Sequence, residues 1–137
     1  MSKFFYTPTQ SEEKINSLKK DIQKFNIDIF FENIKTIPSG HYVTILSQNE
    51  EIQKKIYNLI KKNTNLDKLV KINDNTITTQ HVTIDFIILN VYNMKGIDGH
   101  LIYIIGDNFE NQIICKLICE CVLPYCIFGQ QLLLVES

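Results

Sequence analysis

The sequence predicts an α+β fold in which an antiparallel sheet carries about two helices on one face, and three observations lead to this expectation. The chain has 137 residues, 45% of them hydrophobic and 21% charged, which is typical of a single globular domain spanning residues 1–137. Two amphipathic helical patterns lie in the first half. The second half consists mainly of short β-type segments, and the connections between them are too short for parallel crossovers.

Each of the two predicted helices begins with a capping-box pattern, in which a hydroxyl residue is followed three positions later by Glu. Thr9 and Glu12 form the first pattern, and Ser47 and Glu50 form the second. Apolar residues then recur at helical spacing, at Ile15, Leu18, Ile22 and Phe25 in the first helix and at Ile52, Ile56, Leu59 and Ile60 in the second. We expect both apolar stripes to pack on the same face of the sheet.

Strands are expected where β-branched and apolar residues alternate with polar ones. These segments are 27–31, 41–46, 68–72, 79–91, 101–105, 113–122 and 132–135. Turn-forming residues separate several of them, at 38–40, 73–75 and 93–99.

The four cysteines, Cys115, Cys119, Cys121 and Cys126, fall within 12 residues. Their spacing lacks the paired C-x2-C motifs of structural zinc sites. The odd positions of segment 113–122 are all apolar, which places three of the cysteines on the core face of a strand, where free Cys behaves as a small apolar residue. A metal site and redox chemistry are the alternatives.

The charges limit the choice of partners. The chain has 14 basic and 15 acidic residues, and a net charge of −1 argues against binding to duplex DNA or to anionic membranes. Every basic residue is Lys, so an anion site must use Lys, His, hydroxyl or backbone N–H groups instead of Arg forks. With neither a signal-peptide pattern nor a run of about 18 apolar residues, the expected protein is soluble and cytoplasmic.

The segment 80–86 carries the residues best suited to chemistry. In a strand, Val82 and its alternate neighbours face the helices, while His81, Thr83 and Asp85 share the other face. Residues two apart in a strand lie about 6–7 Å apart, so the imidazole and the hydroxyl can reach one phosphodiester, the ring to exchange a proton and the hydroxyl to bind an oxygen. The alternative is that these three residues form only the solvated face of the strand.

The segment 81–84, with His81 and Thr83 separated by one residue and followed by an apolar one, resembles the His-x-Thr motif of the two-histidine (2H) phosphoesterases. From about residue 39 onwards the chain is similar to the Swiss-Army-Knife RNA-repair-like branch of that superfamily. The matching parts are an early Gly-x-Tyr strand at 40–43, a helix at 50–62, the His81 strand, and two β segments around a Gly-Asp turn at 106–107.

The second motif of that family is degenerate here. It is expected on the last strand after a Leu-Pro segment, where this chain has Gln130 and Gln131 followed by leucines. An amide can donate a hydrogen bond to a phosphate but cannot shuttle protons. Tyr42 and Thr44 share a strand face that is expected near the cleft. His41 is the first candidate for a substitute acid, ahead of His100, and the alternative is that both are ordinary surface or turn histidines.

The resemblance implies a metal-independent, cofactor-free phosphodiesterase for a 2′,3′-cyclic phosphate, a 2′–5′ oligonucleotide or a cyclic dinucleotide, with RNA ends or small nucleotides as partners. His81 is the general acid or base, and Thr83 holds the phosphate. The expected substrate-binding residues are Tyr42, Thr44, Asp85, Gln130 and Gln131. The alternatives are an inactive 2H-like module that binds a nucleotide or a protein, and a generic α+β domain with an accidental motif.

Overall fold

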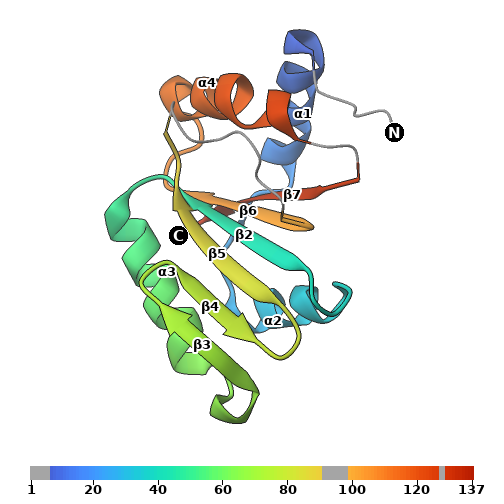
Figure 1. Ribbon diagram of the computed structural model, residues 1–137. Helices are drawn as coiled ribbons and strands as arrows, with labels where there is room; N and C mark the ends of the chain where they lie inside the picture. The colour runs from blue at the N-terminus through green and yellow to red at the C-terminus, as the bar shows by residue number, and fades with distance from the viewer. Residues whose placement is uncertain (1–6, 91–98, 127–128) are drawn as a thin grey trace.

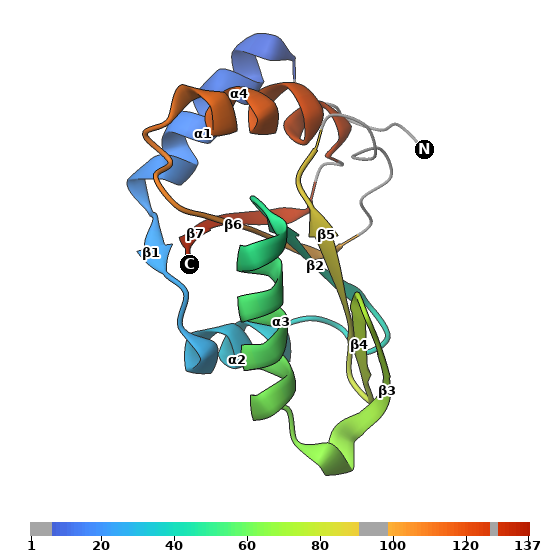
Figure 2. The ribbon, with the colours of Figure 1, turned by 90° about the vertical axis from the view of Figure 1, so that its left-hand side faces the viewer.

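The computed structural model describes residues 7–90, 99–126 and 129–137 and contains one mixed sheet with helices on both faces (Figures 1 and 2). The helices are α1 (Pro8–Lys20), α2 (Ile27–Lys35), α3 (Glu50–Asn63) and α4 (Gln112–Cys121), with short 3-10 turns η1 (Leu66–Lys68) and η2 (Leu123–Tyr125). The strands are β1 (Gln23–Lys24), β2 (Tyr42–Ser47), β3 (Leu69–Asn73), β4 (Thr76–Thr79), β5 (Thr83–Ile88), β6 (Leu101–Gly106) and β7 (Gln131–Glu136).

The sheet has the strand order β1-β7-β6-β2-β5-β4-β3 among the described residues. The first five strands in this order are mutually parallel, and the antiparallel pairs among the described strands are β5–β4 and β4–β3. The α+β class is thus confirmed, but the expected antiparallel sheet was wrong. Its premise fails because α4 connects β6 to β7 and provides the crossover that parallel strands require.

The segment 113–122 was expected as a strand and lies in and just after helix α4. Ile114, Ile118 and Val122, which are four residues apart, are all buried, and Asn111 caps the helix by accepting a hydrogen bond from the Ile113 N–H at 2.8 Å. A segment this rich in apolar residues fits a period of two as well as a helical period. Its cysteines pack against the core from the helix instead of from a strand face.

Segment 27–31 is also helical and not extended, since it forms the first part of α2. The Asn26 side chain accepts hydrogen bonds from the N–H groups of Asp28 and Ile29 and starts the helix. Phe30 and Ile34, one helical turn apart, are buried against the sheet.

The two helices predicted from the sequence are present, with different caps. Thr7 and Gln10 form the capping box of α1, two residues before the expected pair. Asn49 caps α3, whereas Ser47 is the buried last residue of β2. The expected core positions are buried in both helices: Ile15 and Leu18 in α1, and Ile52, Ile56 and Ile60 in α3.

The helices form two layers instead of the single layer expected. Helices α1 and α4 cover one face of the sheet, and α2 and α3 cover the other, each pair with its own apolar core (Figure 2). Strand β6 runs between the two cores, and all six of its residues are buried. Within the described residues, no helix has the length and apolar character needed to cross a membrane.

The strand expected at 79–91 is interrupted. Strands β4 and β5 form a hairpin, and the chain turns at residues 80–82 between them. Strands near 41–46, 68–72, 101–105 and 132–135 are confirmed as β2, β3, β6 and β7, and the turns at 38–40 and 73–75 are also present. The turn expected at 93–99 lies outside the described residues, except for Gly99.

Candidate functional site

The three histidines of the chain lie at the same end of the sheet, where strands β2, β5 and β6 begin. His41 and His100 directly precede β2 and β6, and His81 lies two residues before β5. These three strands are adjacent and parallel, so their amino ends lie at the same end of the sheet. Backbone hydrogen bonds fix the arrangement: the N–H of Gly40 donates to the carbonyl of His81 at 2.8 Å, and the N–H of His100 donates to the carbonyl of Tyr42 at 2.8 Å.

His81 lies in the β4–β5 turn and not in a strand, and Thr79 organises this turn. The Thr79 hydroxyl donates to the Val82 carbonyl at 2.9 Å and accepts from the N–H groups of His81 and Val82 at 3.2 and 3.0 Å. The alternation expected for 80–86 therefore begins only at Val82, because strand periodicity does not extend through a turn. The inference that His81 shares a strand face with Thr83 and Asp85 was wrong for this reason.

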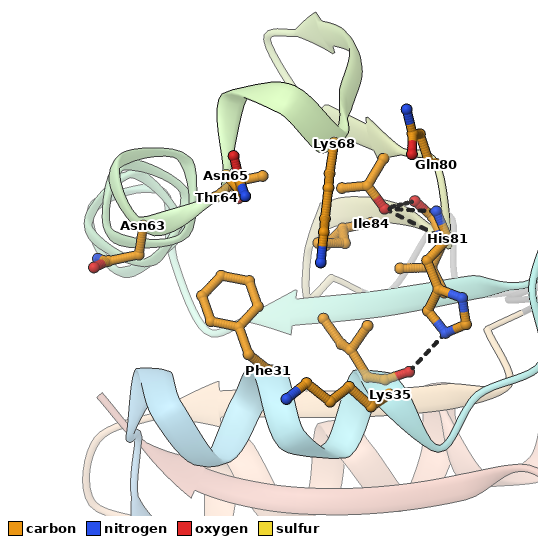
Figure 3. Close-up of a pocket in the computed structure, with 12 residues that line it drawn as sticks. Phe31, Lys35, Asn63, Thr64, Asn65, Lys68, Gln80, His81 and Ile84 are labelled. Atoms are coloured by element: carbon orange, nitrogen blue, oxygen red, sulfur yellow. Dashed lines mark hydrogen bonds between the residues drawn. The ribbon is translucent and has the colours of Figure 1, made fainter.

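The His81 side chain points towards α2 and lines a pocket of about 520 Å³ (Figure 3). Its Nε2 lies 3.2 Å from the Ile34 carbonyl oxygen, in the last turn of α2. The pocket has an apolar part, formed by Phe31, Ile34, Val82 and Ile84. The remaining lining residues are polar: Lys35, Asn63, Thr64, Asn65, Lys68, Thr79 and Gln80.

Two lysines give the pocket its charge. Lys68 extends from η1 towards α2 across the pocket, and Lys35 lies along α2 (Figure 3). Lys35 also pairs with Glu32 at 2.9 Å on the exposed surface of α2, an interaction worth little to stability because both side chains are solvated. Among the described residues that line the pocket, none is acidic.

The segment that forms one wall of the pocket is richer in lysine than the chain as a whole. Residues 54–71, which form most of α3, η1 and the start of β3, contain six lysines and a single acidic residue, Asp67. A cluster of one sign raises the local concentration of anions even when the net charge of the whole chain is near zero. The wall of the pocket formed by residues 63–68 belongs to this basic segment.

Thr83 and Asp85 lie on β5 in register with Tyr42 and Thr44 on β2. Because side chains alternate along a strand, these four residues share the sheet face opposite to the one formed by Ile84 and Phe86 against α3. Thr44 is buried at 2% exposure, which leaves it unavailable to a ligand. Thr83, Asp85 and Tyr42 do not line the His81 pocket.

Asp85 is half-buried on this other face. Burial raises the pKa of its carboxyl group, and a hydrogen bond from the Thr76 hydroxyl at 3.4 Å partly opposes this effect. Asp85 pairs with Thr76 of β4 in the sheet, so the described hydrogen-bond partner of its carboxylate is a neighbouring strand residue and not a residue of the pocket.

The two glutamines of the expected second motif lie at the start of β7 and do not line the pocket. Gln130 donates from its amide to the Gly99 carbonyl at 2.9 Å, and Gln131 begins β7 opposite Leu101. Strands β6 and β2 lie between β7 and β5, a separation of about 14 Å at the usual strand spacing. His81 and the glutamines thus do not line one cleft.

Sequence reasoning found His81 but missed Phe31, Lys35, Lys68 and the 63–65 segment. Phe31 and Lys35 were missed because α2 was assigned as a strand that ended at residue 31. Lys68 was overlooked because only the folded chain brings η1, which carries it, beside α2 and the His81 turn. The excess of lysine over residues 54–71 was the one available signal.

The chain matches no protein-family model and no curated protein. The resemblance to two-histidine phosphoesterases therefore remains a prediction from the sequence.

Proposed function

We propose that the chain binds a small phosphorylated ligand of the nucleotide class, such as a 2′,3′-cyclic nucleotide or a short 2′–5′ linked oligonucleotide, in the His81 pocket. One observation carries this proposal: His81 and Lys68 lie beside an apolar surface in a pocket without acidic lining residues among those described. Phosphate is attracted by the ammonium group of Lys68, and a base needs the apolar surface.

The volume and shape of the pocket suit one nucleotide unit. Pockets for small ligands typically measure about 300–1,000 Å³, and this one measures about 520 Å³. Phe31 is half-buried and offers a flat apolar surface on which a base can stack. The amides of Asn63, Asn65 and Gln80 provide further hydrogen-bond donors and acceptors.

Lys68 contributes more to anion binding than Lys35 does. The carbonyl end of a helix carries partial negative charge, and Lys35 lies in the last turn of α2, where it offsets that charge. Lys68 lies on η1, beyond the end of α3. The Ile34 carbonyl accepts from His81 Nε2 when that nitrogen carries a proton, which fixes the plane of the ring.

Binding is favoured over turnover by the positions of the histidines. A metal-independent phosphodiesterase of the expected kind uses two imidazoles on one phosphate, one as base and one as acid. Neither His41 nor His100 lines the His81 pocket. We therefore favour a nucleotide-binding module, which was the alternative to the enzyme in the sequence interpretation.

Calorimetric titration of a nucleotide panel tests this proposal. The panel contains a 2′,3′-cyclic nucleotide, a 2′–5′ dinucleotide, a cyclic dinucleotide and inorganic phosphate. Lys68→Gln should weaken binding about tenfold, because one charge-assisted contact to phosphate is lost. The matched control is Lys116→Gln, which removes the same charge from α4 on the other face of the sheet and should leave binding unchanged.

Three other results have clear meanings. Equal affinity in Lys68→Gln and Lys116→Gln would show that nucleotides bind elsewhere or by net charge alone. Failure of the whole panel to bind at millimolar concentration would exclude a nucleotide site. Turnover that resists EDTA and disappears in His81→Asn would establish the phosphodiesterase instead of the binding module.

A further inference from the structure

We propose that His41 and His100 form a binding site for a first-row divalent transition-metal ion, such as Zn²⁺ or Cu²⁺. The two rings are in contact, with centroids 5.4 Å apart and planes at 83° to each other. Both residues are exposed. This site is independent of the nucleotide-binding proposal, because neither residue lines the His81 pocket.

The distance between the rings is the one that a shared metal ion requires. Imidazole nitrogen binds Zn²⁺ at about 2.0–2.1 Å, so two imidazoles on one tetrahedral ion have centroids about 5 Å apart. The observed separation is 5.4 Å, and because both rings are exposed, rotation about their side-chain bonds can turn a nitrogen of each ring towards a shared ion.

The backbones of both histidines are held by the sheet. The His41 carbonyl accepts from the N–H of Thr83 at 3.1 Å, and the His100 carbonyl accepts from the N–H of Gln131 at 3.1 Å. The N–H of His100 donates to the carbonyl of Tyr42, the residue after His41, at 2.8 Å. Two ligands on such a rigid support lose little backbone entropy when they bind an ion.

Glycines fix the approach of the chain to each histidine. Gly40 precedes His41 with a φ of +86°, a conformation that other residues rarely adopt. Gly99 precedes His100 so close to β2 that an added Cβ would lie 2.5 Å from the Thr44 hydroxyl oxygen. Both histidines are therefore positioned by backbone features that a side chain at the preceding residue would disturb.

The ligand set indicates the class of ion. Two neutral imidazoles favour Zn²⁺, Cu²⁺ and Ni²⁺ over Mg²⁺ and Ca²⁺, which prefer oxygen, and Cu²⁺ is expected to bind most tightly. In the part of the chain that the structure describes, no group of three or more His, Cys, Asp or Glu side chains converges on one point. The ion would thus complete its coordination with water.

The cysteines offer a competing site that the experiment must separate. Cys115 and Cys119 lie one turn apart on α4. Burial raises the pKa of the Cys119 thiol, with a further contribution from Cys115, and a protonated thiol is a poor metal ligand.

The test is titration of the full chain with Cu²⁺ alone and Zn²⁺ alone, using the third histidine as the matched control. Wild type and His81→Asn should each bind one ion, and His41→Asn and His100→Asn should each bind it at least about tenfold more weakly. Electron paramagnetic resonance of the Cu²⁺ form should show two coordinated nitrogens in wild type. One ion should also protect His41 and His100, but not His81, from chemical acylation.

The proposal is overturned by any of three results. The first is the absence of saturable binding at ion concentrations up to about 1 mM, since a dissociation constant above that value is too weak to be functional. The second is a weakening in His81→Asn equal to that in His41→Asn and His100→Asn. The third is that the His41→Asn/His100→Asn double variant still binds the ion and that binding is lost when Cys115 and Cys119 are changed to Ser. Circular dichroism of each variant without metal checks that the fold is unchanged. Because both histidines are exposed, the substitutions should leave it intact.

Discussion

The two faces of the sheet are both covered by a pair of helices, but they differ in what the helices leave open. On the α1/α4 face, Ile114, Ile118 and Val122 form a buried stripe along α4 and into the turn that follows it. On the α2/α3 face, the last turns of both helices end beside a pocket of about 520 Å³ that His81 and Lys68 line. Both faces thus have a buried apolar core that supplies stability, and the α2/α3 face also carries a pocket lined by chemical groups.

The largest effect on stability is expected from truncation of Ile118, on the α1/α4 face. This side chain is fully buried, so Ile118→Ala should lower the free energy of unfolding by about 2–5 kcal/mol through lost burial and a residual cavity. Urea denaturation measures the change. Ile113→Ala, on the same helix at 77% exposure, is the control and should change stability by less than about 0.5 kcal/mol. Similar losses in both variants would contradict the assignment of α4.

An alkaline loss of stability is expected from the buried thiol on the α1/α4 face. Burial raises the pKa of Cys126 from 9.0 to about 11. Because the folded-state value is the higher one, the stabilisation is complete below pH 9 and is lost as the pH rises towards 11, by about 2 kcal/mol. Urea denaturation between pH 8 and 11 should show a smaller loss in Cys126→Ala. Identical pH profiles would show that this thiol is not protected.

A smaller effect on stability, coupled to the pocket, is expected from Thr79. Its hydroxyl bonds the N–H groups of His81 and Val82 and the Val82 carbonyl, so Thr79→Ala should cost about 1–2 kcal/mol and displace His81. Nucleotide binding should weaken in the same variant. Thr78→Ala, one residue earlier in β4, should retain binding. If Thr79→Ala binds as wild type does, the turn does not position the pocket.

The smallest effect is expected from Phe31, whose role is in binding more than in stability. Phe31→Leu retains apolar bulk in α2 but removes the flat ring, and should weaken nucleotide binding about three- to tenfold. Binding of inorganic phosphate should not change, because phosphate does not stack. Calorimetry with both ligands checks this contrast. Equal weakening for the two ligands would mean that Phe31 acts only by shaping the pocket.

The sequence was sufficient for those elements whose patterns have one interpretation. Helices α1 and α3 alternate apolar and charged residues with a clear helical period, and β2, β6 and β7 are short and rich in branched residues. Helices α2 and α4 were assigned as strands because dense apolar segments fit both periods. The discriminating signals were the capping residues Asn26 and Asn111, which start these helices.

The site was only partly predictable, for two physical reasons. The turn at 80–82 contains neither Gly nor Pro and depends on one threonine hydroxyl, so residues 79–91 read as a continuous strand. The misassigned strand then placed His81 on the wrong face. Lys68 reaches the pocket from η1, and His41 meets His100 across adjacent parallel strands, contacts that depend on a topology different from the expected one.

The most direct test of the central claim is a nuclear magnetic resonance titration of the ¹⁵N-labelled chain with a 2′,3′-cyclic nucleotide. The largest backbone shifts should lie in residues 31–35, 63–68 and 79–84, which surround the pocket, and α4 should show none. The Lys68→Gln variant should need about ten times more ligand for the same shifts. Absence of shifts, or a set of shifts centred away from these segments, would contradict the proposed nucleotide site.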